Sequence, residues 1–263
     1  MRLFWELARL AFRRQMTYRA ANLAGLATNF FFGLLRVAVL VALYGARQEM
    51  AGLSVIGAIT FTGLSQAIIA CFSLFGWAEV ANSVYTGDVS SDLLKPMNYF
   101  GFWLAADCGR AVAALLVRGV TIMVGYALLF PITVPRDLAQ WLALALALAL
   151  AWLVNFSWRF LVNLVAFWTP DARGIVRFGY VAMWIMSGFI MPLRLYPDWF
   201  IRLCQFTPFP AMIATPLDVY LNVLTGPAAI EALLGQALWA VLLIAAGQAA
   251  LRLGVRRLVI QGG

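Results

Sequence analysis

Residues 138–168 read LAQWLALALALALAWLVNFSWRFLVNLVAFW, and this stretch decides the class of the fold. Leucine and alanine alternate from Leu142 to Ala151, a period that by itself would suit a β-strand. Alanine and leucine are nevertheless the best helix formers, and an apolar surface on every side is typical of a helix that faces lipid. The stretch exceeds the roughly 20 residues that cross a bilayer, so it predicts a transmembrane helix.

The composition of the whole chain extends this interpretation. Hydrophobic residues make up 64% of the 263 residues and charged residues only 11%, whereas a soluble domain is usually about half apolar and a quarter charged. The sequence therefore predicts an all-α membrane protein with several spans, organised as a single transmembrane domain over residues 1–263.

The charged and reactive residues exclude several classes of function. The net charge is +8, but the cations lie at the ends of apolar runs instead of forming a basic domain, so we expect no nucleic acid partner. The sequence has no histidine, the usual general base and commonest metal ligand. Cys71, Cys108 and Cys204 are scattered and are expected to be small buried residues. No catalytic residue, metal site or cofactor is predicted, and the chain is not expected to be an enzyme.

The first 20 residues contain leucines at helical spacing, with arginines on the other faces. This pattern predicts an amphipathic helix over residues 1–20 that lies in the membrane interface, because its apolar stripe is too narrow for a span. The alternative is a basic flank without regular structure. The continuous charge in this segment also argues against a cleavable signal peptide.

Six spans are predicted from the apolar runs, and cations orient them. Of the 19 lysines and arginines, three lie far from either end of a predicted span and only four at the predicted outer ends. The other twelve lie at the opposite ends, which places both termini in the cytoplasm. Trp77 and Trp103 are then expected near the inner headgroups, and Trp141 and Trp199 near the outer ones. The predicted spans are 22–44, 53–79, 103–130, 138–168, 175–191 and 230–253.

The segment between the last two spans is apolar but rich in proline. Residues 187–222 hold five of the ten prolines, and no proline-free run there is long enough to cross. We predict that Pro197 opens a short helix over residues 198–206, and that Pro208 and Pro210 end the next turn. Residues 192–216 are then interpreted as re-entrant helices at the outer face, covered by protein. A surface-lying amphipathic loop is the alternative.

The loop SVYTGDVSSDLLKPMNY, residues 83–99, lies between the second and third predicted spans. Gly87 favours a turn, and Asp88 is a good N-cap for a helix of about two turns. Pro96 biases Lys95, the only lysine of the chain, out of that helix.

An apolar ridge is expected on this short helix. Val89, Leu93 and Leu94 would face the cytosol, edged by Asp92 and Lys95. Such a ridge suits docking into a groove of a partner. An ordinary interfacial helix between two spans is the alternative.

Two motifs carry a resemblance to a known family. VYTGDVSSDLLKP, residues 84–96, and the later SGFIMPLRLYPDWF with FPAMIATPLDVY, within residues 187–220, resemble signatures of permease subunits of ABC transporters of the export-associated ABC-2 type. The similarity extends over essentially the whole chain, and the two motifs together are fairly specific.

The resemblance implies a function and partners. Loop 83–99 would be the coupling loop, whose helix 88–96 docks into a separate ATPase subunit that binds ATP and Mg. The complex would contain two ATPase copies and a second permease, either a different homologous chain or another copy of this one. The location would be the bacterial inner membrane. The implied ATPase-coupling residues are Tyr85, Gly87, Asp88, Val89, Asp92, Leu93, Leu94, Lys95 and Pro96. The implied residues of an exit gate are Pro192, Pro197, Trp199, Pro208 and Pro210.

The sequence indicates that the energy source lies outside this chain, but it does not identify the substrate. No GxxxxGK[ST] stretch is present, and Pro96 follows the sole lysine, so this chain is not expected to bind ATP itself. Ten tryptophans and nineteen phenylalanines suit either lipid contact or an apolar substrate path. We expect an amphipathic, lipid-like or drug-like substrate, with a peptide or a polysaccharide precursor as the alternatives.

Three arginines lie far from the ends of the predicted spans. Arg36 and Arg118 are both placed roughly 20 Å from the inner boundary, and Arg159 is about ten residues from the inner end of its span. Because buried arginine is costly, each is a candidate for a polar substrate path or for intramembrane pairing. Snorkelling or bonding to backbone carbonyls is the alternative. Asp107 is expected to pair with Arg110 or another cation near the inner face.

Three other classes of function remain to be weighed. A secondary transporter or channel not coupled to ATP would favour internal repeats or acidic residues at the midplane, and neither is found. A membrane-embedded enzyme would need a metal cluster or paired carboxylates. A purely structural membrane subunit differs from a permease in having no ATPase partner.

Overall fold

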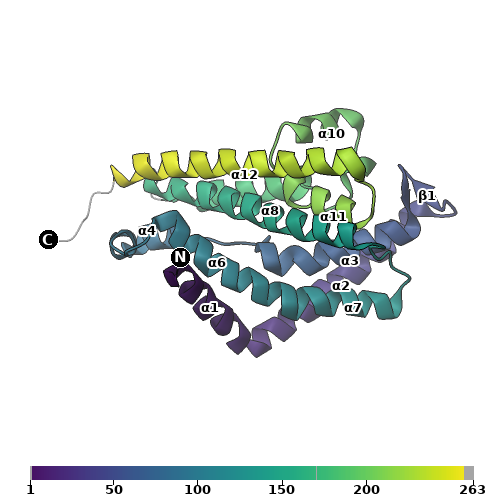
Figure 1. The fold of residues 1–263 in the computed structure, drawn as a ribbon, viewed down its shortest axis with the longest axis horizontal. Coiled ribbons are helices and arrows are strands. Elements are labelled where there is room, and N and C mark those ends of the chain that lie inside the picture. The colour runs from purple at the N-terminus through teal and green to yellow at the C-terminus, as the bar shows by residue number, and fades with distance from the viewer. Residues whose placement is uncertain (1, 170, 258–263) are drawn as a thin grey trace.

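Five helices in residues 2–169 and 171–257, the part of the chain that this computed structural model describes, are long and apolar enough to cross a membrane. They lie side by side in an elongated bundle (Figure 1). The prediction of an all-helical chain with several apolar spans is confirmed to this extent. The five are α2 (Arg19–Tyr44), α3 (Val55–Phe72), the continuous α6–α7 helix (Tyr99–Leu129), α8 with its 3₁₀ extension η2 (Leu138–Phe167), and α12 (Gly226–Val255).

The sixth predicted span, 175–191, corresponds to a shorter helix. Helix α9 (Arg173–Met186) has 14 residues, about 21 Å at 1.5 Å per residue, against a hydrocarbon core of about 30 Å. The helix stops because Gly188 adopts a left-handed conformation with φ +82° and Pro192 follows. Six full spans are therefore not confirmed.

The second predicted span, 53–79, was wrong at both ends. Leu53–Ser54 form strand β2, which pairs antiparallel with β1 (Glu49–Met50), and the Ser54 side chain accepts a hydrogen bond from the Gly57 N–H to start α3. At the other end α3 stops at Phe72, and residues 73–78 form a non-helical linker. The hydrophobic run continues through this linker, so hydropathy alone does not locate the break.

Helix α3 lies at the centre of the bundle. In its most apolar window 78% of the residues are buried, against 17–33% for the other four long helices. Small and hydroxyl side chains, including Gly63 and Ser65, allow this close packing. A Cβ at Gly63 would lie only 2.7 Å from the Tyr126 ring.

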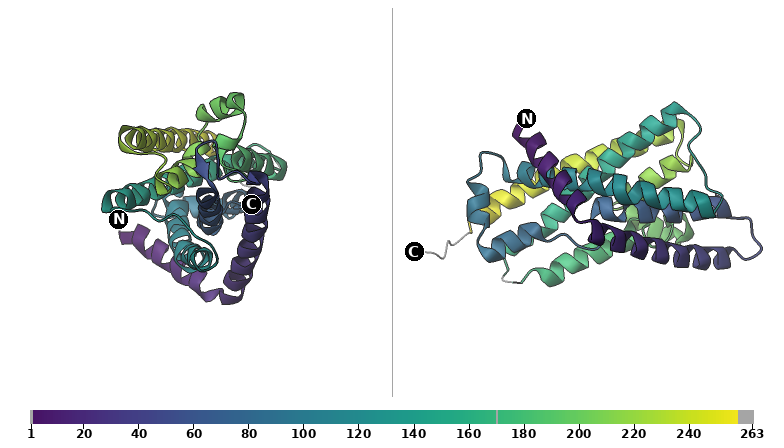
Figure 2. Two further views of the ribbon diagram at one scale, coloured as in Figure 1. Left: turned by 90° about the vertical axis from the view of Figure 1, so that its right-hand side faces the viewer. Right: turned by 90° about the horizontal axis from the view of Figure 1, so that it is seen from below.

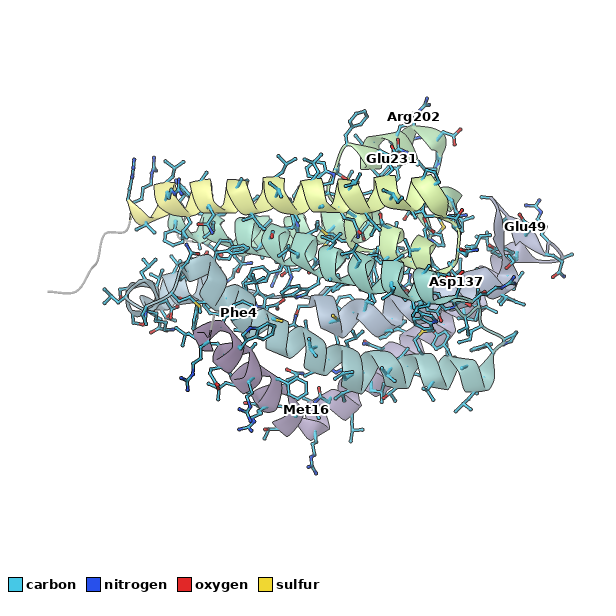
Figure 3. All side chains as sticks on the ribbon, viewed as in Figure 1. Phe4, Met16, Glu49, Asp137, Arg202 and Glu231 are labelled. Carbon is cyan, nitrogen blue, oxygen red and sulfur yellow. The ribbon has the colours of Figure 1, made fainter. Side chains whose placement is uncertain are left out.

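Short elements occupy the two ends of the bundle. At one end, which we call the α4 end, lie α4 (Glu79–Thr86) and α5 (Val89–Leu93); β1 and α10 (Asp198–Gln205) lie at the opposite β1 end (Figures 1 and 2). Glu49, Asp137, Arg202 and Glu231 are also found at the β1 end (Figure 3). The remaining elements are η3 (Leu193–Leu195), η4 (Pro210–Met212), α11 (Ala214–Tyr220) and the π-turn η1 (Leu115–Gly119) between α6 (Tyr99–Ala114) and α7 (Val120–Leu129).

The predicted N-terminal helix is α1 (Arg2–Thr17), which crosses the side of α6 (Figure 2). The two backbones meet at Gly109, where a Cβ would lie 1.8 Å from the Ala8 carbonyl oxygen. Ala8 is buried in this contact, whereas Leu3 and Leu10 are exposed. The apolar residues of α1 thus serve two surfaces, one against α6 and one left open.

This contact leads to a prediction about stability. In an unhindered helix Gly→Ala is favourable by about 1 kcal/mol, but at Gly109 the methyl group would force α1 away from α6. We expect Gly109→Ala to lower the melting temperature of the purified protein by roughly 2–10 °C, from an overpacking cost of about 1–3 kcal/mol. Gly235→Ala is the control, because no atom lies within 4 Å of a Cβ there. Equal melting temperatures for the two variants would contradict the close crossing.

Candidate functional site: a protruding hairpin and its buried anchor

The α4–α5 hairpin, residues 79–96, is the most prominent feature of the α4 end. Gly87 ends α4 with φ +81°, so the glycine turn predicted here is confirmed. Helix α5 begins at Val89, but the Asp88 carboxylate does not cap it. The Asp88 carboxylate instead accepts a hydrogen bond from the Thr86 hydroxyl at 2.7 Å. Lys95 lies beyond the end of α5, as Pro96 predicts.

Asp92 holds the hairpin closed. Its carboxylate accepts a hydrogen bond of 2.6 Å from the Ser83 hydroxyl and pairs with the Lys95 ammonium group at 2.6 Å. The same ammonium group lies 3.7 Å from the centre of the Phe102 ring. Asp92 was predicted to edge an exposed ridge, but it is 8% exposed and points inward.

The apolar ridge predicted on α5 is reduced to one residue. Val89 is 2% exposed and Leu93 packs against the main hydrophobic core, whereas Leu94 is 85% exposed. The prediction was wrong for Val89 and Leu93 because a five-residue helix lying on the bundle must bury one side. Of the three apolar residues predicted to form the ridge, Leu94 is therefore the one that stays accessible at the surface.

Two hydrogen bonds attach the hairpin to neighbouring segments, and a third attaches the linker that precedes it. The Tyr85 hydroxyl accepts a hydrogen bond from the Ala172 N–H, directly before α9. The Ala81 N–H donates to Asn163 Oδ1 at 3.2 Å, and Asn163 Nδ2 donates to the Trp77 carbonyl at 3.0 Å. Because Asn163 is the last residue of α8, the hairpin is tied to both α8 and α9.

The linker between α3 and α4 leaves carbonyl groups that no helix satisfies. Arg110 donates to the Ala70 and Cys71 carbonyls at 2.7 and 2.8 Å. The Trp184 indole N–H donates to the Leu74 carbonyl at 2.7 Å, and the Tyr180 hydroxyl donates to the Trp77 carbonyl at 3.0 Å. Side chains from α6, α8 and α9 thus replace the lost helical hydrogen bonds.

A buried ion-pair cluster supports this linker. Asp107 accepts from Arg110 at 2.7 Å and from Arg159 at 2.9 Å, and the Trp152 indole N–H adds a third donor at 2.9 Å. Asp107 and Arg159 are only 2% and 1% exposed. The pairing expected between Asp107 and Arg110 is confirmed, and Arg159 pairs with the same carboxylate inside the bundle.

Trp77 belongs to the same region, and its side chain is buried in the bundle. It was expected near the inner headgroups, but it is 6% exposed, and the Arg159 guanidinium carbon lies 5.3 Å from its ring centre. The linker turns the indole into the bundle. Trp141 and Trp199 are 46% and 64% exposed, which agrees with their expected places at a surface.

Arg36 binds the broken end of α9. Its guanidinium donates to the Phe189 and Ile190 carbonyls, the latter at 2.7 Å, and to the Ser65 hydroxyl at 3.5 Å. The alternative of bonding to backbone carbonyls therefore describes Arg36 better than an open polar path. Its partners exist because the chain leaves the helical conformation after Met186.

Arg118 binds the beginning of α2. It donates to Asn22 Oδ1 at 3.0 Å and to the Ala21 carbonyl at 3.4 Å, both in the first turn of α2. Arg118 therefore links the third span to the start of α2, and its predicted depth of roughly 20 Å stays a prediction.

The proline-rich segment is partly as expected. Helix α10 begins after Pro197, as predicted, and its Trp199 is exposed. Pro210 begins the 3₁₀ turn η4 instead of ending a turn, and Pro208 lies in the bend before it. Helix α11 packs against α8, and the Ala214 N–H donates to the Ser187 carbonyl at 3.1 Å. Whether Pro192 and these prolines form an exit gate stays a prediction.

The sequence interpretation missed Asn163 and the link between Asp107 and Arg159. A signal was present, because Asn155, Arg159 and Asn163 recur every four residues in an otherwise apolar helix. That spacing places them on one helical face. Arg159 Nε donates to Asn155 Oδ1 at 2.7 Å, and the Arg159 carbonyl accepts from Asn163 at 2.8 Å.

A bundle of membrane-length helices with a short helical hairpin at one end is typical of a multi-pass membrane protein. The chain matches the family described as ABC-2 family transporter protein over residues 30–262, and it belongs to that family. The resemblance found from the two motifs is confirmed. Searches of curated proteins and of solved structures gave no match. Permeases of this family normally work with an ATPase subunit.

The ion-pair cluster yields a prediction. Asp107→Asn removes the charge that compensates fully buried Arg159, and breaking a buried pair costs about 3–5 kcal/mol. We expect the melting temperature in detergent to fall by about 6–20 °C. Asp171→Asn is the matched control, because the Asp171–Arg173 pair is exposed and 3.9 Å long. The double variant Asp107→Leu/Arg159→Met should recover part of the loss. An effect of Asp107→Asn no larger than that of Asp171→Asn would contradict the cluster.

Proposed function

We propose that this chain is the membrane subunit of an ATP-driven exporter, powered by a separate ATPase that docks on the α4–α5 hairpin. The observation that carries the proposal is the hairpin itself. It exposes Leu94 at the end of α5, while Ala81 and Tyr85 of α4 are bonded to α8 and to the residue before α9. A surface that is exposed outward and rigidly attached inward suits the transfer of mechanical force.

The attachments suggest the route of that force. A push on Leu94 would reach α9 through Tyr85 and would reach α8 through Asn163. The linker would carry it to α3, the central helix of the bundle. Movement of α9 relative to α2 would then act on the contact between Arg36 and the Phe189 and Ile190 carbonyls, and so on the β1 end where we propose the exit.

The orientation follows from charge. We place the α4 end in the cytoplasm, with both termini on that side and the bacterial inner membrane as the location. Supporting this, the described arginines of α1 lie toward that end (Figure 3), and Arg173 and Arg177 of α9 lie beside the hairpin. Met1 and residues 258–263 lie outside the described residues.

The complete transporter would contain more than this chain. We propose two ATPase copies, which bind ATP and Mg, and a second permease, either a homologous chain or another copy of this one. The substrate would be amphipathic, lipid-like or drug-like. The segment with Pro192, Pro197, Trp199, Pro208 and Pro210 would border its exit.

Docking is tested at Leu94. We expect Leu94→Asp to weaken co-purification with the proposed ATPase partner by at least about tenfold. Burying an apolar anchor of this size contributes roughly 1.5–3 kcal/mol, and the carboxylate would instead have to be desolvated. The variant spares the fold, because Leu94 lies outside the hydrophobic core.

Phe206→Asp is the control for docking. Phe206 is 82% exposed, as Leu94 is 85% exposed, but it lies at the β1 end. It should leave co-purification unchanged. A complex that survives Leu94→Asp in full would favour a transporter or channel that is not coupled to ATP.

Force transfer is tested at Tyr85. Removing the hydroxyl in Tyr85→Phe breaks the hydrogen bond to Ala172 but leaves the exposed Leu94 side chain unchanged. We expect the ATPase to co-purify normally, while the stimulation of its ATP hydrolysis by the permease falls at least about twofold. Tyr18→Phe is the control, since Tyr18 is 55% exposed and its hydroxyl has no hydrogen-bond partner among the described residues. Unchanged stimulation in Tyr85→Phe would exclude this route.

A further inference from the structure

A cavity of about 510 Å³ lies between the α4–α5 hairpin, the linker and α9. This is within the range of about 300–1,000 Å³ that is typical of sites for small molecules. Its walls include Phe75 and Trp77 of the linker, Tyr85 of α4, and one face of α9.

The lining of the cavity changes along α9 from charged to aromatic side chains. Arg173, Arg177, Tyr180 and Trp184 line it at spacings of four, three and four residues, so they follow one face of the helix. Both arginines are exposed, at the α4 end of the bundle, whereas Tyr180 is 6% exposed and Trp184 half-buried. A ligand along this face would meet positive charge at one end and aromatic surface at the other.

The two arginines are weakly neutralised. Arg173 pairs with Asp171 only at 3.9 Å, and both side chains are largely exposed. Arg177 has no ion pair in the described ranges 2–169 and 171–257. This differs from the neighbouring cavity under α1, where Arg110 is already bound to Asp107 and to two carbonyl groups. The cavity beside α9 therefore favours an anion.

The apolar walls distinguish a lipid from a soluble anion. Phe75 is 63% exposed and Val181 42% exposed beside this cavity. A free phosphate would occupy the arginines but leave this surface uncovered, whereas an acyl chain would cover it at about 0.8 kcal/mol per buried CH₂. Basic pockets between helices at a membrane face suit anionic lipid headgroups.

We propose that the cavity between the hairpin and α9 binds an anionic phospholipid from the leaflet at the α4 end. The phosphate lies between Arg173 and Arg177, and an acyl chain follows Tyr180 and Trp184 past Phe75. The bound lipid touches both the hairpin and α9, the two elements joined by the Tyr85–Ala172 hydrogen bond. Binding of this lipid does not depend on an ATPase partner or on the direction of transport.

The test measures lipid retention by the purified full-length chain. The protein is delipidated in detergent, incubated with phosphatidylglycerol or phosphatidylcholine of the same acyl chains, and examined by native mass spectrometry. We expect phosphatidylglycerol to be retained at least tenfold better. The variant Arg173→Gln/Arg177→Gln should lose this preference by about tenfold or more, because two headgroup contacts disappear.

Two further variants separate a built site from general attraction. Arg9→Gln/Arg13→Gln on α1 removes the same charge from exposed positions elsewhere and should retain the lipid normally. Val181→Trp keeps both arginines but fills the apolar part of the cavity, and it should reduce retention by about tenfold. Glycerol 1-phosphate at millimolar concentration should not displace the bound lipid.

Three results would overturn the proposal. The first is unchanged retention in Arg173→Gln/Arg177→Gln, which would place the lipid elsewhere. The second is an equal loss in the α1 control, which would indicate net charge alone. The third is displacement by glycerol 1-phosphate together with normal retention in Val181→Trp, which would identify a site for a soluble phosphate.

Discussion

The structure depends on one constraint: the backbone groups freed where α3 stops at Phe72 must find partners inside the protein. Lipid offers no hydrogen bonds, and an unsatisfied carbonyl in hydrocarbon costs several kcal/mol. Arg110, Asn163, Tyr180 and Trp184 provide the missing donors from three other helices. The break in α3 is therefore also the place where α6, α8 and α9 are held together.

The negative charge of Asp107 stabilises the buried arginines of this region. Without it, Arg110 and Arg159 would bring two positive charges into one buried region. With it, Arg110 keeps an ion pair while still donating to the Ala70 and Cys71 carbonyls. A similar arrangement recurs at the end of α9, where Arg36 satisfies the Phe189 and Ile190 carbonyls. In both places an arginine satisfies backbone carbonyls where a helix ends early.

The same break relates the fold to the proposed function. The short linker, residues 73–78, connects the hairpin directly to the central helix α3. Its contacts with α8 and α9 make it a rigid element, and Leu94 is the part left exposed. The cavity beside α9 adjoins these contacts, so a lipid there would join the same elements that the hydrogen bonds join.

The sequence by itself determined the class of the fold, the family, the position of the hairpin and most of the long helices, because hydropathy, proline and glycine act locally. Gly87, Pro96 and Pro197 have the effects on the chain that their own geometry predicts. Only the tertiary structure decided where α3 ends, which side of α5 is buried, and which partners Arg36, Arg118 and Arg159 take. Those outcomes depend on donors and acceptors contributed by segments distant in sequence, such as Asn163 meeting Trp77. A hydropathy profile contains no information about that pairing.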